Sequence, residues 1–270
     1  MSPRIRPTRD HADLLAAAGE LPWVRYGVDP GWGTPSWVHE ASVACRAGDG
    51  AVSVAVVRRR RSYGTSLTVL GPGAPELVDA LLPGLRAADT DPSARVGALT
   101  VPRAAEAGVA GRLGLSPGAA ARWEWMWTTR PPEAMPKEAS VRELDVGDPG
   151  GAARVAAFLR AHSPRHSTPP DGDPAGPWLG VLRGDGALLA CGTWAEVTSG
   201  VPVLASIAVA PAARGRGLGA AVTAALTRRA FAAGAPACAV DLYSDNDAAR
   251  RLYRRLGYRL DQEFSSWTLR

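Results

Sequence analysis

A short glycine-rich segment contains the residues best suited to bind an anionic ligand. It reads Arg214-Gly-Arg-Gly-Leu-Gly219 and lies between an expected strand, 203–209, and an expected helix that continues to Ala233. Glycine lets the backbone turn tightly, so that successive N–H groups point to one place at the start of a helix. The helix dipole adds about half a positive charge there. The segment therefore favours a pyrophosphate, to which Arg214 or Arg216 could add hydrogen bonds.

Two residues farther along the chain could complete such a site. Asn246 begins the turn into an expected helix, 247–256, where its side chain could cap the helix or contact a ligand. Tyr253 lies two turns later on the inner face of that helix. An ordinary tyrosine pKa of about 10 suits an acid that protonates a departing thiolate. Tyr253 could equally be an aromatic residue of the core.

The elements around these residues predict a mixed α/β layer structure for the second half of the chain. Asp148 is a suitable N-cap for the first helix, and Arg183-Gly-Asp-Gly186 is typical of a hairpin turn. Gly234 closes the glycine-rich helix. The expected order is β-α-β-β-β-α-β-α-β, with strands at 141–144, 178–182, 188–197, 203–209 and 237–243, and one or two strands within 258–269.

The first half of the chain repeats the second half of this pattern. Residues 100–115 align without gaps on residues 243–258, and each half closes on Trp-Thr-x-Arg, at Trp127 and at Trp267. We interpret this as an internal duplication, with domains at 1–130 and 138–270 joined by a proline-rich linker, 131–137. The repeated elements are expected at 67–70, 75–86, 96–101, 103–113 and 122–130.

The segment 206–219, together with 246–258, resembles the acetyl-CoA signature of the GNAT acetyltransferase superfamily. The resemblance implies an α/β chain made of two tandem GNAT-like domains, with acetyl-CoA as co-substrate. It implies that backbone groups of Ile207 and Val209 hold the acyl and pantetheine portions. The loop from Arg214 to Ala220, which includes Gly215, Arg216, Gly217 and Gly219, would hold the pyrophosphate. Asn246 would contact the pantetheine arm, and Tyr253 would protonate the leaving thiolate.

The resemblance leaves the general base open. Some members carry a carboxylate on the strand equivalent to 203–209, and here that strand has none. Others, such as the enzymes that acetylate the amino termini of ribosomal proteins, have a glutamate five residues before the asparagine, and Asp241 stands at that position. Asp241, or a water that it holds, is therefore the candidate base, with Glu196 on the neighbouring hairpin strand as the alternative. Asp241 could also serve only the structure of the strand.

The first half departs from the pattern where the cofactor would bind. Arg103 and Ala110 stand at the positions of Asn246 and Tyr253. The phosphate loop is replaced by Gly71-Pro-Gly-Ala-Pro75, in which the prolines have no N–H to donate. We therefore expect a degenerate copy that has lost cofactor binding.

These patterns predict an N-acetyltransferase that moves acetyl from acetyl-CoA to a primary amine by direct attack. The alternative is a non-catalytic acyl-CoA sensor or scaffold. A dinucleotide-binding module is a third reading, because Gly215-x-Gly217-x-x-Ala220 fits a loose Rossmann pattern. About 50 residues follow that loop, too few to complete a doubly wound sheet. The acceptor is expected to be a small-molecule or peptide amine, contacted by 152–176 and 178–197, with 164–173 as a loop that could close over it.

The composition narrows the remaining possibilities. The net charge of +5 comes almost wholly from arginine, since Lys137 is the single lysine, and no aromatic pattern accompanies it; no nucleic-acid partner is expected. Cys45, Cys191 and Cys238 are too far apart for a disulfide framework or a metal site, so we expect buried, reduced thiols. No run of about 20 apolar residues predicts a membrane span, and we expect a cytoplasmic monomer.

Overall fold

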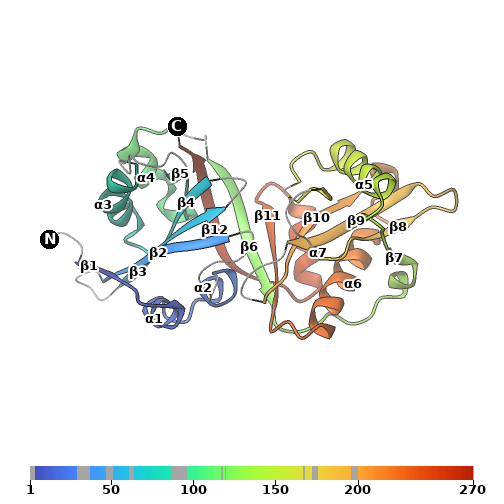
Figure 1. Cartoon of the computed structure of the whole chain (residues 1–270), viewed down its shortest axis with the longest axis horizontal. Coiled ribbons are helices and arrows are strands. Elements are labelled where there is room, and N and C mark those ends of the chain that lie inside the picture. The colour runs from blue at the N-terminus through green and yellow to red at the C-terminus, as the bar shows by residue number, and fades with distance from the viewer. Residues whose placement is uncertain are drawn as a thin grey trace. The chain divides into compact units, whose positions relative to one another are not determined.

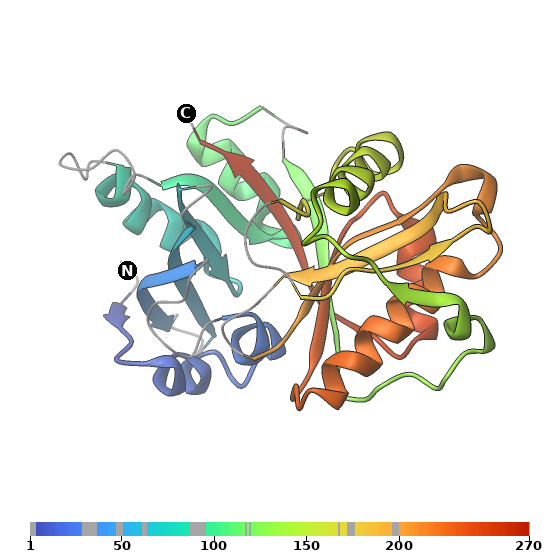
Figure 2. The same cartoon turned by 45° about the vertical axis from the view of Figure 1, so that its right-hand side comes forward.

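The structure is a computed structural model that describes residues 4–28, 37–46, 51–60, 64–86, 96–116, 118, 120–166, 168–171, 176–195 and 200–269. Its elements are shown in Figures 1 and 2. The chain forms two compact units. Unit 1 comprises Met1–Trp125, Tyr243–Asp245 and Leu260–Arg270, and unit 2 comprises Met126–Leu242 and Asn246–Arg259.

The described residues of unit 1 form four α-helices and the strands of the N-terminal half. The helices are α1 (His11–Ala17), α2 (Pro22–Gly27), α3 (Ala74–Arg86) and α4 (Glu106–Leu113), the last preceded by a 3-10 turn, Arg103–Ala105. The strands are β1 (Arg4–Pro7), β2 (Trp37–Arg46), β3 (Val52–Arg60), β4 (Gly64–Leu70), β5 (Val96–Pro102) and the start of β6 (Ala121–Thr128).

The sheet of unit 1 is antiparallel from β1 to β4 and parallel between β4 and β5. Helix α3 connects these two parallel strands, as a crossover connection requires. Its apolar side buries Leu77, Val78 and Leu82 against Leu67 and Leu99 of the strands. This core fixes β4 and β5 side by side.

Unit 2 repeats the same order with three helices. The helices are α5 (Pro149–His162), α6 (Leu218–Ala232) and α7 (Asp247–Arg255). The strands are β7 (Val141–Glu143), β8 (Leu179–Leu182), β9 (Leu188–Ala195), β10 (Val203–Val209) and β11 (Cys238–Tyr243), with 3-10 turns at Pro136–Ser140 and Pro211–Ala213.

Strands β7 to β10 are antiparallel, and β10 and β11 are parallel. Successive side chains of these strands point to opposite faces, and α5 and α6 cover one face each. Ala190 and Ile207 pack with the α6 side, whereas Cys191 and Ala208 pack with α5. The structure confirms the expected order of elements in the second half. Of the one or two strands expected after α7, the described residues form one, β12 (Arg259–Thr268).

The C-terminal strand belongs to the unit formed by the other half of the sequence. Strand β12 pairs antiparallel with β5, from Phe264 opposite Pro102 to Thr268 opposite Ala98. Residues 126–128 at the end of β6 belong to unit 2. The compact units therefore do not follow the sequence-based boundaries at 130 and 138: residues 260–270 lie in unit 1, and the segment expected to be a linker, 131–137, lies in unit 2.

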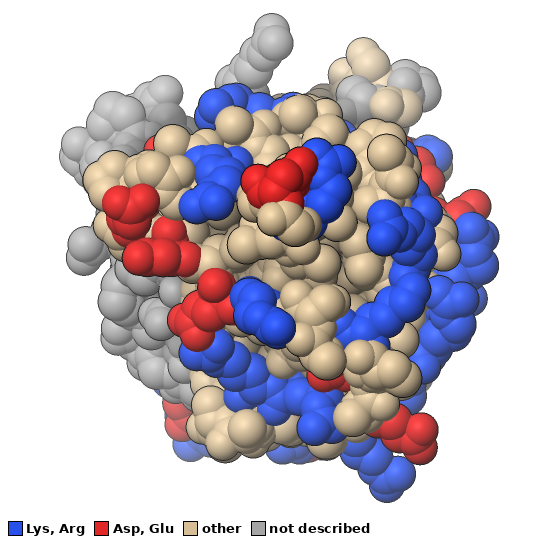
Figure 3. All heavy atoms as spheres, turned by 90° about the vertical axis from the view of Figure 1, so that its right-hand side faces the viewer, with Lys and Arg blue, Asp and Glu red and all other residues tan. Residues whose placement is uncertain are grey.

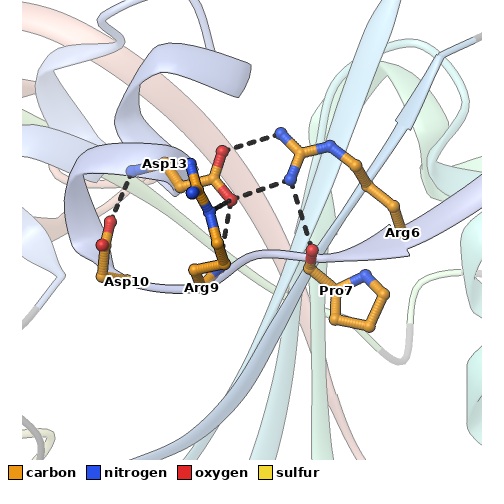
Figure 4. A network of polar contacts seen from close by, with 5 residues as sticks. All are labelled: Arg6, Pro7, Arg9, Asp10 and Asp13. Carbon is orange, nitrogen blue, oxygen red and sulfur yellow. Dashed lines mark hydrogen bonds and ion pairs between the residues drawn. The ribbon is translucent and has the colours of Figure 1, made fainter.

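A polar network holds the start of unit 1 together (Figure 4). Asp10 caps α1 by accepting a hydrogen bond from the Asp13 N–H. The Asp13 carboxylate accepts two bonds of 2.8 Å from the Arg6 guanidinium and one from the Arg9 N–H. The bonds from Arg6 first, and from Arg9 next, hold the pKa of Asp13 well below its usual range. Their contribution to stability is present at neutral pH and is lost only in strong acid.

None of the helices in the described residues is both long and apolar enough to span a membrane.

Candidate active site

Strands β10 and β11 separate partway along their length. Their parallel pairing covers Val203 opposite Ala239 and Leu204 opposite Val240. A bulge follows in β10 between Ala205 and Ala208, where Ser206 adopts a φ of 55°, in the left-handed region. Strained backbone of this kind costs about 1–3 kcal/mol and persists where the surroundings hold it. The bulge turns Ile207 and Val209 toward a groove that both residues line.

The glycine-rich segment forms one wall of this groove. Gly215 and Gly217 have φ values of 73° and 78°, which only glycine adopts at little cost. Gly217 is the N-cap of α6, and no side chain caps that helix end. The first N–H groups of α6 thus have no acceptor within the helix. The uncapped start of α6 is suited to an anion.

Gly219 allows α6 to approach β10 closely. A Cβ atom at this position would lie 3.2 Å from Val209 Cγ2 and 3.5 Å from Leu252 Cδ1. Arg214 also contacts β10, because its Nε donates a hydrogen bond to the Val209 carbonyl at 3.4 Å. The glycine-rich loop, the bulged strand and helix α7 therefore meet at one place.

Asn246 caps α7, one of the two roles expected for it. Its Oδ1 accepts a hydrogen bond of 3.1 Å from the Ala249 N–H, and the residue also lines the groove. The hydrogen bond to the Ala249 N–H fixes the orientation of the Asn246 side chain at the edge of the groove. Capping and ligand contact are compatible here.

Tyr253 presents its hydroxyl group to the groove from the inner face of α7. The residue is 5% exposed and packs against the ring of Tyr258, with ring centroids 5.8 Å apart. Within the described part of the chain, the Tyr253 hydroxyl makes no hydrogen bond, although the residue lines the groove. A buried phenol left without a partner is expected to find one in water or a ligand.

Burial first, and the charge of Asp241 second, raise the pKa of Tyr253 above its ordinary value. The raised pKa favours the neutral phenol in the folded state, so the associated stability is complete below pH 10 and falls only at higher pH. We therefore expect turnover to show no alkaline loss due to Tyr253 up to pH about 10. A profile of kcat against pH tests this, and a decline between pH 8 and 9 that Tyr253→Phe removes would contradict it.

The groove has a volume of about 1560 Å³ and lies wholly within unit 2. It exceeds the roughly 300–1,000 Å³ of a typical small-molecule pocket, so it has room for an extended ligand. Eight of the predicted site residues line it together: Ile207, Val209, Arg214, Gly215, Gly217, Gly219, Ala220 and Asn246, and Tyr253 joins them.

The remaining predicted residues lie elsewhere. The Arg216 carbonyl accepts a hydrogen bond from Lys137 Nζ, and Arg216 does not line the groove. Asp241 lies on β11 with an exposed side chain and is likewise not part of the lining. Glu196 falls outside the described residues. The assignment of Asp241 as base stays a prediction.

The sequence analysis missed part of the lining. His162 and Ser163 contribute from the end of α5, and His162 packs edge-on against Phe158 at 4.6 Å between ring centroids. Residues 128–136, which include most of the expected linker 131–137, also line the groove, as do Arg255 and Arg259. The prolines indicated an irregular segment there. No local sequence pattern shows which other residues such a segment contacts.

The loop after α5 is tied to the bulge. Ser206 Oγ donates to the Thr168 carbonyl at 2.7 Å, and Thr168 is buried. The sequence predicts that 164–173 is a loop able to close over the acceptor, and this stays a prediction. Thr168 lies in its centre, Ser167 and 172–173 lie outside the described residues, and the bond to Ser206 ties Thr168 to the bulge of β10.

Unit 1 has the same elements without the features that form the groove. Its parallel strands β4 and β5 stay paired from Thr65 to Thr68. The Gly73 N–H at the start of α3 donates to Ser53 Oγ at 2.8 Å, so the chain itself fills the anion position. Arg103, which replaces the asparagine, donates to Ser244 Oγ and to the Phe264 carbonyl. These contacts involve the residues that align with the groove residues of unit 2, and the loss of cofactor binding by the first copy stays a prediction.

Gly71→Ala is expected to destabilise unit 1, because the turn before α3 is packed directly on β3. A Cβ atom there would lie 2.5 Å from the Val52 carbonyl oxygen, and φ is +94°. We expect a loss of about 1–3 kcal/mol in the free energy of unfolding, measured by urea denaturation. The matched control is Gly111→Ala in α4, where nothing lies within 4 Å. Equal stability of the two variants would contradict the packing argument.

The three thiols are buried, as expected. Burial raises the pKa of Cys191 to about 12 and that of Cys238 to about 11, so neither is a thiolate at neutral pH. We expect iodoacetamide at pH 8 to leave the native thiols unmodified and turnover unchanged, and to modify all three in denaturant. Mass spectrometry measures this. Rapid labelling of Cys191 with loss of turnover would instead support an acyl-cysteine intermediate.

Comparison with known proteins agrees with this geometry. Residues 140–258 match the model of the acetyltransferase (GNAT) family. A GNAT-family acetyltransferase from Colwellia psychrerythraea is 14% identical and covers 99% of this chain and 100% of its own, with a TM-score of 0.50. A GCN5-related N-acetyltransferase from Kribbella flavida is 19% identical over 79% of this chain and 85% of its own, with a TM-score of 0.51.

A GNAT-family acetyltransferase from Novosphingobium aromaticivorans is 21% identical, covering 78% of this chain and 86% of its own, with a TM-score of 0.50. At these identities the likeness shows the fold. Residues 140–258 match the GNAT acetyltransferase model, and the chain has the fold of two tandem GNAT-like units, of which the second contains the groove.

Proposed function

We propose that unit 2 is an N-acetyltransferase that takes acetyl from acetyl-CoA and transfers it directly to a primary amine. The observation that carries the proposal is the groove beside the point where β10 parts from β11, which is lined both by the uncapped start of α6 and by Tyr253. The GNAT family model that matches residues 140–258 is a family of acetyltransferases.

The shape of the groove fits an extended thioester with phosphates at one end. An extended amide-bearing arm can hydrogen-bond to a strand edge in place of a neighbouring strand, and Ile207 and Val209 lie where β11 no longer pairs. The N–H groups of residues 215–220 suit the pyrophosphate. Asn246 also lines the groove, and its side-chain amide nitrogen would donate to the arm.

Acetyl-CoA would supply an activated carbonyl carbon. In the proposed step the amine nitrogen forms a bond to this carbon, the carbon–sulfur bond breaks, and the sulfur leaves with the electron pair. Tyr253 would give its proton to that sulfur and recover one from water. Burial raises the pKa of Tyr253, so the phenol is protonated at neutral pH, and the same rise makes it a weaker acid toward the sulfur than an ordinary tyrosine. The proton lost by the amine goes to a base, for which Asp241 or a water held by it is our candidate.

Calorimetric titration with acetyl-CoA, propionyl-CoA and NAD is the first test. We expect saturable binding of acetyl-CoA at one site per chain and no binding of NAD. Two sites would show that unit 1 also binds, and no binding would reject the donor assignment. A panel of amines, with CoA release followed spectroscopically, then tests transfer. Asp241→Asn should lower turnover chiefly at low pH if Asp241 is the base.

A non-catalytic acyl-CoA sensor is the second candidate, favoured by the position of the carboxylates. Among the described residues that line the groove, Glu133 is the one carboxylate, and it comes from the wall 128–136 and not from β10 or β11. Saturable acetyl-CoA binding without amine-dependent release of CoA across the panel would support the sensor over the enzyme.

A further inference from the structure

The groove borders both faces of the sheet in unit 2. Ile207 and Val209 of β10 pack in the apolar cluster of α6 and α7, which includes Tyr253. Ala208, between them, packs instead in the cluster that contains Phe158 of α5. All three strand residues line the groove, and so do the last residue of α5 and its neighbour. The place where β10 parts from β11 therefore has a side toward α5 as well as a side toward α6 and α7.

The side toward α5 is occupied by His162, the last residue of that helix. Its half-buried ring meets Phe158 edge-on, with ring centroids 4.6 Å apart, and Phe158 shares its apolar cluster with Ala208. These contacts hold the imidazole next to the bulged residues of β10. Ser163, which follows His162, is the other lining residue from this end of α5.

The ring nitrogens of His162 make no hydrogen bond within the described part of the chain, which distinguishes this residue from two other histidines. His11 Nε2 is hydrogen-bonded to the Val24 carbonyl at 2.8 Å, and His166 Nδ1 to the Ser163 carbonyl at 2.9 Å. Neither of these two histidines lines the groove. A neutral imidazole has one acceptor nitrogen and one N–H donor, so it can take a proton from a ligand at one nitrogen and release one to water at the other.

Most described carboxylates of unit 2 already bind other groups of the chain. Asp145 and Asp148 accept from N–H groups at the start of α5, and ion pairs with arginines engage Glu138, Glu143, Asp185 and Asp247. Figure 3 shows acidic side chains next to basic ones on one face of the molecule. Asp241 does not line the groove, and Glu133 belongs to the segment 128–136, which packs with α6 through Met135. Of the described lining residues on the side toward α5, His162 is therefore the one with an ionisable side chain.

A thioester bound beside β10 would lie between two side chains that can exchange protons. Tyr253 stands toward α7, where the sulfur would leave, and His162 stands toward α5. The incoming amine must give up a proton, and a base within hydrogen-bond reach lowers the barrier to that step. Imidazole is the side chain whose ordinary charge change falls between pH 5 and 8, which suits a proton acceptor near neutrality.

Resting on the function proposed above, we propose that His162, ahead of Asp241, is the general base of unit 2. The amine nitrogen forms its bond to the acetyl carbon while one ring nitrogen of His162 takes the amine proton. The carbon–sulfur bond breaks, and the sulfur leaves with the electron pair and takes the proton of Tyr253. The imidazolium then gives its proton to water and Tyr253 recovers one from water, so that protons balance over one turnover.

Few groups that face His162 change their charge near neutral pH. From the strands packed against α5, Cys191 lies in the same apolar cluster, and burial raises the pKa of its thiol to about 12. Across the groove, burial raises the pKa of Tyr253 as well, and the arginines of the lining stay charged. Glu133 is the remaining charged group of the described lining, so a variant at that position is part of the test.

The test is the pH profile of kcat at saturating acetyl-CoA and amine. We expect kcat of the wild type to fall about tenfold per pH unit on the acid side, because a protonated imidazole cannot accept the amine proton. His162→Gln should lower kcat by about 10²–10⁴-fold and abolish this acid limb, while calorimetry shows an unchanged affinity for acetyl-CoA. Imidazole added to His162→Ala should restore part of kcat, which the loss of a purely structural contact would not allow.

His11→Gln is the control, because His11 belongs to unit 1 and its ring is engaged by the Val24 carbonyl. This variant should keep the kcat and the acid limb of the wild type. A second measurement needs no turnover. Acetyl-CoA should shift the ring signal of His162 in the proton NMR spectrum, where His162→Gln assigns it by its absence, and should leave the signal of His11 in place.

Two results would overturn the role of His162 alone. The first is an acid limb that persists in His162→Gln, or that Glu133→Gln or Asp241→Asn removes instead. The second is a His162 ring signal that does not move although calorimetry shows acetyl-CoA bound. Binding of acetyl-CoA by the wild type without any amine-dependent release of CoA would reject the proposed transfer, and the role of His162 with it.

Discussion

Gly217→Glu is expected to abolish binding of acetyl-CoA, lowering its affinity by about 100-fold or more. The residue is the N-cap of α6, has a φ of 78° and lines the groove. Glutamate would be strained at that φ, at a cost of about 1–2 kcal/mol. Its Cβ would lie 3.6 Å from Lys137 Cδ, and its carboxylate would stand where the helix start would accept the pyrophosphate. Repulsion between like charges then opposes binding.

The control for backbone strain is Gly234→Glu, at the other end of the same helix. Gly234 has a φ of +90° and nothing within 4 Å of a Cβ, so the substitution introduces similar strain and the same charge away from the groove. We expect Gly234→Glu to lose some stability but to bind acetyl-CoA like the wild type in calorimetry. If Gly217→Glu, folded by circular dichroism, kept wild-type affinity, the pyrophosphate site would have to be placed elsewhere.

Tyr253→Phe is expected to lower turnover by about 10²–10⁴-fold, the range typical of a general acid, without weakening acetyl-CoA binding. The change removes a single oxygen atom, and the Tyr253 hydroxyl makes no hydrogen bond within the described residues, so the fold should tolerate it. Steady-state kinetics with a responsive amine measures kcat, and calorimetry measures the affinity. A leaving group that needs no protonation should recover most of the loss.

Tyr258→Phe separates this effect from a general loss of packing. Tyr258 is 2% exposed, bonds to Thr227 at 2.7 Å and donates to Cys238 Sγ at 3.2 Å, and it does not line the groove. Its replacement should reduce stability by about 1 kcal/mol and leave kcat within a few-fold of the wild type. Similar turnover losses in both variants would return Tyr253 to a purely structural role.

The second half of the chain was predictable because its signals are local. Asp148 accepts from the Gly151 N–H as the first helix cap, Pro211 follows the end of β10, and Gly234 follows α6 with a positive φ. Each of these residues determines the backbone within a few positions of itself. The glycine-rich loop, Asn246 and Tyr253 could be placed in one groove for the same reason, since the elements between them are short.

The features that could not be predicted depend on contacts between distant segments. Trp127 and Trp267 occupy equivalent places in two similar Trp-Thr-x-Arg endings. The local sequence therefore cannot decide which strand each of these two strands pairs with. The elements before Leu67 gave no assigned strands, yet β2 and β3 form a long antiparallel pair there. The positions of Arg255 and Arg259 beside residues 128–136 likewise follow from packing that no periodicity reports.

The pairing of β12 with β5 has a consequence for synthesis of the chain on the ribosome. N-terminal domains usually fold first, while the remainder is still being made. Here the edge of β5 waits for residues 260–270, which are translated only after all the elements from β7 to α7. Until they emerge, β5 presents unpaired N–H and C=O groups of the kind that recruit strands from other chains. A deletion of β12 would therefore damage a unit whose other strands were translated much earlier.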